Sequence, residues 1–159
     1  MRRKDREITD IQTIKKILDG GSVMHIALNN GTYPYILPVN YGYKLNGDKL
    51  ELFFHSSKEG GKHSIIENDC HAAFEIECET EFMPPVGEET CTASYAYASV
   101  IGQGIIEAVP ESEKKEYLAA LVAHFGITAA KFSPAHLANT KMYRIKAESY
   151  TAKRHENHR

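Results

Sequence analysis

The chain has 159 residues, of which 42% are hydrophobic and 25% charged, an ordinary composition for one globular domain with its own core. Its formal net charge of −2 excludes a strongly basic surface, so we expect no nucleic acid among its partners. No run approaches the about 18 apolar residues of a membrane span, and the basic start lacks the apolar segment of a signal peptide. We therefore expect no membrane partner, and three cysteines without metal-binding spacing predict a reducing, cytoplasmic location.

The first predicted elements are a helix and a strand. Thr9 or Asp10 can cap the helix, because a short side-chain oxygen accepts a hydrogen bond from a free backbone N–H. Gly20–Gly21 should end it through the left-handed conformation that glycine tolerates. A strand is then expected at 22–28, and Asn29–Gly31 is a strong turn signal.

Two further strands are predicted around the turn at 46–48. The first, 33–45, contains Pro38, which cannot donate a hydrogen bond to a neighbouring strand. We therefore expect this strand to lie at a sheet edge or to break at Pro38. The second, 50–55, alternates with period two, so residues 50, 52 and 54 should face the core and His55 should face the other way.

The rest of the chain continues with helices and long strands. In order we expect a helix at 62–68, a strand at 71–77, an irregular loop at 79–89, a long β-run at 92–109, a helix from Pro110 to Gly126, a short helix near Pro134, a strand at 142–153 and a disordered tail at 154–159. Residues 1–153 would form a single domain. About six mostly sequential strands predict a mainly β (α+β) fold, an antiparallel barrel with flanking helices.

The loop after the third strand is the strongest candidate for a binding site. It concentrates side chains that can bind a phosphate, together with glycines that let the backbone approach a ligand: His55, Ser56, Ser57, Lys58, Gly60, Gly61 and Lys62. The sequence is neither a Walker A motif nor GxGxxG. An ordinary solvated loop between a hairpin and a helix remains the alternative.

Other candidates carry weaker signals. Backbone groups released near Pro38 could bind a planar heterocycle, although a proline-containing edge strand explains the same residues equally well. Tyr97 and Ser99 share one side of the long β-run and could line a site or simply pack. His155 and His158 lack both HExxH spacing and a third ligand, so we expect no metal site.

Four segments together resemble a known family: MRRKDREITD, YPYILPVNYGY, LELFFHSSKEGGK and YAYASVIGQGIIEAV. They are similar to the flavin-binding split-barrel proteins related to pyridoxamine 5′-phosphate oxidase, and within that group to the 5-nitroimidazole resistance (Nim-type) proteins. The resemblance extends from Met1 to about Lys153. It implies a six-stranded split β-barrel of the FMN-binding type, in a homodimer with two FMN sites at the interface.

The resemblance also implies roles for individual residues. The stretch whose backbone meets the isoalloxazine ring corresponds to Pro38, Val39, Asn40 and Tyr41, and the phosphate and ribityl segment to His55, Ser56 and Lys62. A segment near the flavin or the dimer interface corresponds to Tyr97, Ser99 and Val100. His55 is also the candidate catalytic residue on the substrate side. Gly61 stands where relatives often have arginine, so Lys58 could supply the missing charge. The chain lacks the basic C-terminal strand that binds pyridoxal phosphate, so the vitamin B6 reaction is not expected.

Three functions follow as hypotheses. The leading one is an FMN-dependent reductase, with FAD as a possible substitute, acting on small planar nitroaromatic (5-nitroimidazole-like) or quinone-like compounds; the sequence names neither the electron donor nor the physiological substrate. The second is a non-catalytic flavin-binding or redox-sensing module. The third is a haem-binding split barrel that uses His25, His63 or His71.

Overall fold

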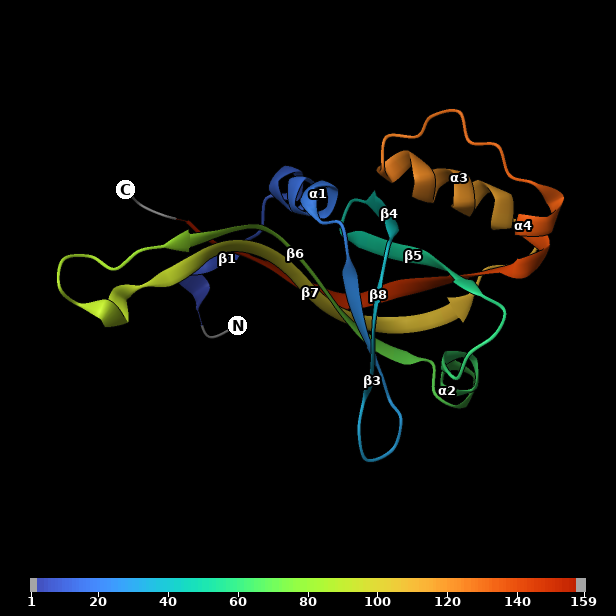
Figure 1. Ribbon diagram of the computed structural model, residues 1–159, viewed down its shortest axis with the longest axis horizontal. Coiled ribbons are helices and arrows are strands. Elements are labelled where there is room, and N and C mark those ends of the chain that lie inside the picture. Colours follow the sequence, from blue (N-terminus) through green and yellow to red (C-terminus); the bar gives the residue numbers. More distant parts are fainter. Residues whose placement is uncertain (1–2, 157–159) are drawn as a thin grey trace.

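The computed structural model describes residues 3–156, which are organised by one antiparallel sheet of eight strands (Figure 1). The strands are β1 (Glu7–Ile8), β2 (Met24–Leu28), β3 (Tyr35–Val39), β4 (Gly42–Asn46), β5 (Lys49–Ser57), β6 (His71–Met83), β7 (Ser94–Ala108) and β8 (Thr140–His155). The helices are α1 (Ile11–Gly20), α2 (Lys62–Asn68), α3 (Lys114–His124) and α4 (Pro134–Asn139), with 3₁₀ turns η1 (Lys4–Arg6) and η2 (Thr90–Thr92). The predicted fold class is confirmed, but the number of strands is eight instead of six.

The extra strands come from two places. Residues 33–45 form two strands, β3 and β4, and Glu7–Ile8 pairs with the far end of β8. The sheet order is β3-β2-β6-β7-β8-β5-β4, so β3 and β4 are consecutive in the chain yet lie at opposite edges of the sheet. The predicted edge position of Pro38 is confirmed, because β3 is an edge strand that ends one residue later.

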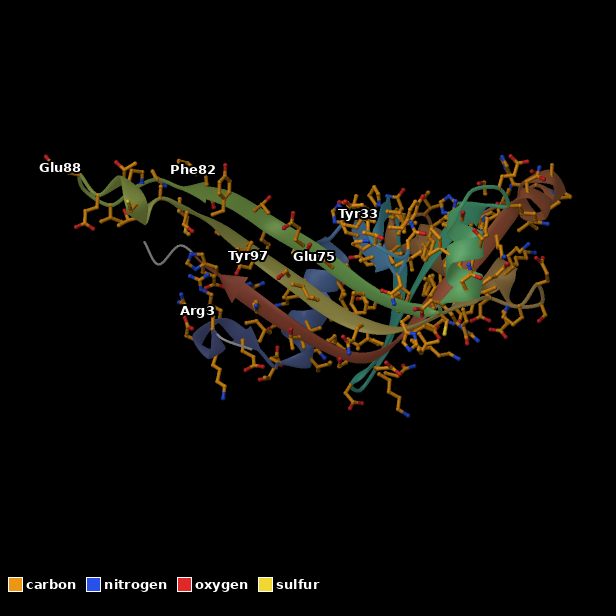
Figure 2. The ribbon with its side chains drawn as sticks, turned by 90° about the horizontal axis from the view of Figure 1, so that it is seen from below. Arg3, Tyr33, Glu75, Phe82, Glu88 and Tyr97 are labelled. Carbon is orange, nitrogen blue, oxygen red and sulfur yellow. The ribbon has the colours of Figure 1, made fainter. Side chains whose placement is uncertain are left out.

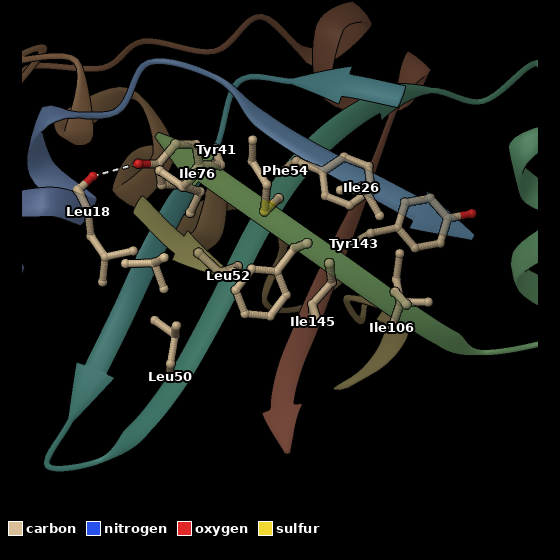
Figure 3. Close-up of a cluster of buried hydrophobic side chains, with 14 of the residues drawn as sticks. Leu18, Ile26, Tyr41, Leu50, Leu52, Phe54, Ile76, Ile106, Tyr143 and Ile145 are labelled. Carbon is tan, nitrogen blue, oxygen red and sulfur yellow. Dashed lines mark hydrogen bonds between the residues drawn. The ribbon is translucent and has the colours of Figure 1, made fainter. Parts of the chain in front are cut away.

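The main core lies inside the curled sheet and is closed by α1 (Figure 3). The predicted alternation on β5 is confirmed: Leu50, Leu52 and Phe54 are buried in this core, whereas His55 is exposed. Phe53 points the other way into a second cluster under α3, where its ring packs edge-on against Tyr117. Both sides of β5 are therefore buried until the chain reaches His55.

The residues between β3 and β4 are fixed to the end of α1. The hydroxyl of Tyr41 donates a hydrogen bond to the backbone oxygen of Leu18 at 2.6 Å (Figure 3). The expected left-handed cap is wrong, because Gly21 has a φ of −76°. Close packing explains this glycine instead: an added Cβ would lie 2.5 Å from a methyl group of Ile76 and 2.7 Å from the Tyr41 hydroxyl.

β6 and β7 extend past the rest of the sheet as a long hairpin arm (Figures 1 and 2). The expected loop at 79–89 is therefore wrong in its first part, since β6 continues to Met83. The expected disordered tail is wrong for Arg154 and His155, which belong to β8, and Arg154 binds the carboxylate of Glu79 at 2.9 Å. Residues 157–159 lie outside the described part. No helix between residues 3 and 156 is long and apolar enough to cross a membrane.

Candidate functional site: the split of the barrel

The barrel is split between β3 and the second half of β5. Within residues 3–156, β3 pairs only with β2, and β4 leaves β5 at Phe53, so residues 54–57 of β5 pair only with β8. A strand with one neighbour leaves about half of its backbone donors and acceptors free. Two such edges border the same gap, so a planar polar ligand in the gap can hydrogen-bond to backbone groups that no neighbouring strand uses.

A hollow of about 360 Å³ occupies this split. It is lined by Tyr35, Leu37, Pro38, Val39, Phe54, His55, Ser56, Ser57 and Lys62. Six of these are residues that the sequence proposed for flavin binding, and they come from β3, β5 and the start of α2. The two ends of the proposed site, separate in sequence, therefore meet at one hollow.

The loop at one end of the hollow holds two donors that converge on one acceptor. The backbone oxygen of Glu59 accepts hydrogen bonds from Ser57 Oγ at 2.8 Å and from Lys62 Nζ at 3.4 Å. A hydroxyl and an ammonium that reach the same oxygen atom can also reach one oxygen of a phosphate. Gly60, with a φ of 123°, makes this turn possible, because side chains strongly disfavour that conformation.

Several predicted residues lie near the hollow without lining it. Asn40 donates its side-chain N–H to the backbone oxygen of Ser22, and the Tyr41 side chain is fully buried, where burial raises the pKa of its phenol. Only their backbone groups are therefore available for the predicted ring contact. Lys58 and Gly61 are exposed loop residues.

The predicted β7 residues lie apart from the hollow. Val100 is buried in the core. Tyr97 and Ser99 are on the opposite side of β7, the side of the exposed Ile101, but Tyr97 is half-buried and Ser99 is only 4% exposed (Figure 2 labels Tyr97). One subunit does not bring these residues to the hollow.

Sequence reasoning missed the residues that hold the loop in place. His63 Nε2 donates to the backbone oxygen of Ser57 at 3.0 Å, and its Nδ1 is 2.6 Å from the hydroxyl of Tyr143 on β8. Tyr143 is buried, and its ring stacks against Phe54. The pairing of β5 with β8 brings Tyr143 beside Phe54 and His63. A local sequence pattern cannot predict which residues of two distant strands will lie side by side.

A second, smaller hollow of about 270 Å³ contains an oriented histidine. Asp69 accepts hydrogen bonds from the side chain of Asn29 and from both the backbone N–H and the ring Nδ1 of His71. These bonds, with that from Asn29 the largest, lower the pKa of Asp69 to about 2. An ionised carboxylate only accepts, so Nδ1 of His71 carries the hydrogen, and His71, whose side chain is 67% exposed, is one of the residues that line the hollow. Among the described residues no group of three potential ligands is arranged for a metal ion, and His158 lies outside them.

Comparison with known proteins places the chain in a family. Residues 10–154 match the family model described as pyridoxamine 5′-phosphate oxidase. The chain belongs to this family. No protein in the curated set matches the sequence.

Several solved structures are similar to this chain over nearly its whole length. A protein from Bacteroides thetaiotaomicron, provisionally named for 5-nitroimidazole antibiotic resistance, is 21% identical with a TM-score of 0.77, covering 92% of this chain and 85% of that one. An FAD- and haem-binding protein from Mycobacterium smegmatis is 21% identical, with a TM-score of 0.80 and coverages of 96% and 74%. A flavocytochrome from Azotobacter vinelandii is 17% identical, with a TM-score of 0.79 and coverages of 99% and 72%. At these identities the similarity establishes the fold.

Proposed function

We propose that the chain binds FMN in the split of its barrel and uses it to reduce small planar nitroaromatic or quinone-like compounds. The observation that carries the proposal is the hollow itself, where two free strand edges meet a loop with converging donors. The β3 edge at Pro38 and Val39 fits the polar rim of a flavin ring, and Ser57 with Lys62 fits its phosphate. The structural neighbours named for FAD and haem binding, for a flavocytochrome and for 5-nitroimidazole resistance support a flavin ligand in general.

Bound flavin would supply the electron transfer, and the protein would supply position and a proton. His55 lies on the rim of the hollow with an exposed side chain, so its imidazole can orient a substrate or donate a proton to it. Tyr35 lies on the same rim and offers a flat surface to a planar compound. Both side chains are free to contact a ligand without disturbing the core.

We also propose that two copies pair through the outer side of the sheet and complete each other's sites. Ile36 on β3 and Ile101 on β7 are exposed there, beside a shallow, mostly apolar hollow of about 440 Å³. Tyr97 and Ser99 continue this side along β7, which would bring them to the partner's flavin. Contiguous exposed apolar side chains of this kind are typical of interaction surfaces. The free cysteines support a cytoplasmic location for the pair.

The direct test is the absorption spectrum of the purified protein, followed by mass spectrometry of the released cofactor. We expect a yellow protein that releases FMN, and apo-protein that takes up added FMN. Release of FAD would correct the cofactor, and failure to bind any flavin would overturn the proposal. Reduction of a 5-nitroimidazole or a quinone by the reduced holoprotein would distinguish a reductase from the non-catalytic flavin-binding module.

A haem site is the second candidate, and the Asp69–His71 pair favours it. Of the three histidines considered from the sequence, His63 has both ring nitrogens engaged, and His25 shares the shallow apolar hollow. Of these three, only His71 has one ring nitrogen held by a carboxylate while its side chain lines a hollow, and a carboxylate partner is usual for histidines that bind metals. A Soret band on adding haem, lost in His71→Ala but kept in His25→Ala, would support this site, and no Soret band would exclude it.

A further inference from the structure

The loop at the split has less positive charge than a phosphate ligand requires. A phosphate monoester carries about −1.5 to −2 charges at neutral pH. Lys62 is the cation of this loop that lines the hollow. Lys58 is exposed on the loop and is not among the residues that line the hollow.

Lys141, at the start of β8, is placed to supply the second charge. It is the direct cross-strand partner of Ser56, and Ser56 lines the hollow. Directly paired residues point to the same side of a sheet, with their Cβ atoms about 4.5–5.5 Å apart. A lysine side chain is long enough to bring its ammonium from that position to a group bound beside Ser56.

The ammonium of Lys141 is held only loosely. Its nearest carboxylate oxygen, on the exposed side chain of Glu67, is 3.9 Å away, at the limit of an ion pair. It also lies 5.2 Å from the centre of the Tyr143 ring, a cation–π contact. The side chain is 31% exposed, so it can move toward a ligand without leaving a buried partner unpaired.

The surroundings of Lys141 are the same groups that fix the loop. Tyr143 binds His63, and His63 in turn binds the backbone oxygen of Ser57. The base of the loop, the start of α2 and the first residues of β8 therefore form one connected cluster. Lys141 lies in this cluster at a position that β8 fixes, whereas a side chain on the exposed part of the loop has no such support.

We propose that Lys141 is the second cation of the ligand's phosphate site, opposite Lys62. This inference rests on the proposed flavin function and deepens it. The site then selects ligands with a phosphate, so FMN binds more tightly than riboflavin.

The test compares FMN with riboflavin, which has the same ring and no phosphate. Dissociation constants are measured by flavin fluorescence quenching at low salt for the wild type, Lys141→Met and Lys58→Met, with Lys16→Met on the exposed side of α1 as the matched control. Methionine keeps the packing of the stem and removes the charge. We expect Lys141→Met to weaken FMN binding about tenfold, the usual scale of a charge-assisted contact, and to leave riboflavin binding within about twofold. Lys141→Arg should retain FMN affinity within about threefold, which separates lost charge from poor folding.

The outcomes separate this inference from the proposed function. Equal loss of both ligands in Lys141→Met, unchanged FMN binding, or a selective loss in Lys58→Met instead would overturn the role of Lys141 while flavin binding stands. A wild type that binds riboflavin as tightly as FMN would also overturn it. A wild type that binds neither flavin would overturn both.

Discussion

Tyr41 is the residue that ties the site to the rest of the molecule. Its hydroxyl is buried and donates to the backbone oxygens of Leu18 and Gly21, at the end of α1. Its backbone joins β3 to β4, next to the proposed ring-binding stretch. A side chain that fixes both an edge strand and a helix end keeps the split open at a constant width.

Replacing Tyr41 by phenylalanine should reveal this role and its pH dependence. Losing the hydrogen bond and leaving the Leu18 oxygen unpaired should cost about 1–2 kcal/mol of unfolding free energy at pH 8. Burial raises the pKa of the Tyr41 phenol, so the folded state keeps the neutral form while the unfolded chain ionises near pH 10. The Tyr41 hydroxyl therefore contributes its full stabilisation below about pH 10 and loses it as the pH rises. The difference in unfolding free energy between wild type and Tyr41→Phe should narrow accordingly. Urea unfolding at pH 8, 10 and 11 measures this difference in unfolding free energy. The control variant, Tyr33→Phe at the exposed hairpin, should change the unfolding free energy little. A difference between wild type and Tyr41→Phe that stays constant with pH would contradict the explanation.

Lys62 allows a second prediction at single-residue scale. Its ammonium converges with Ser57 on one backbone oxygen, so replacing it by alanine removes a charge from the proposed phosphate position. We expect FMN binding to weaken by about 1.5–3 kcal/mol, and riboflavin binding to stay constant. Isothermal titration of both flavins provides the measurement. Unchanged FMN affinity would mean that the phosphate binds away from this loop.

At the scale of elements, local patterns predicted the strands whose apolar residues alternate and missed what depends on distant pairing. The alternation of Leu50, Leu52 and Phe54 is enough to define β5 and to place His55 outside the core. Glu79 to Met83 has the acidic composition of a loop, yet it is a strand because the long β7 offers it a partner. For the same reason no local pattern indicates Lys141, because only the pairing of β5 with β8 brings it beside Ser56.

The packing of α3 against the sheet depends on another residue that pairing positions, Arg144. Its guanidinium, 16% exposed, donates to Glu107 at 2.6 Å, to Glu113 at 3.1 Å and to the Tyr117 hydroxyl at 2.9 Å. Glu113 and Tyr117 belong to the start of α3, whereas Glu107 is on β7. One side chain thus joins a helix to two strands.

Arg144→Met should therefore destabilise the protein by about 2–3 kcal/mol, because it removes the cation of the partly buried Glu113 and one of the two cations of Glu107. Lys146→Met is the matched control: its ammonium lies 2.7 Å from the same Glu107 but is about half exposed, so we expect a loss of about 0.5 kcal/mol. Urea unfolding gives both values, and hydrogen exchange should show earlier opening of α3 in Arg144→Met. Equal effects of the two substitutions would show that burial does not set the strength of this network.

For the whole molecule, the proposed flavin site would be only partly supplied by one subunit. The hollow at the split is open, and two of the three β7 residues expected near the flavin, Tyr97 and Ser99, lie on the outer side of the sheet. The open hollow and the outer position of these β7 residues are both explained if a second copy of the chain covers the hollow with its own β7. Dimerisation and flavin binding would then stabilise each other, because each completes the surface that the other needs.

Ile101→Glu tests this arrangement against a matched control. Ile101 and Phe125 are equally exposed, at 43%, but Phe125 lies at the end of α3, away from the proposed interface. We expect the wild type to sediment at twice the 17.8 kDa of one chain, and Phe125→Glu to behave in the same way. Burying an unpaired carboxylate costs several kcal/mol, so Ile101→Glu should weaken the dimer more than about a hundredfold and sediment as a monomer at micromolar concentration. Its FMN affinity should fall in parallel. A monomeric wild type would contradict the dimer, and a monomeric variant with full FMN affinity would show that the split of one barrel is sufficient.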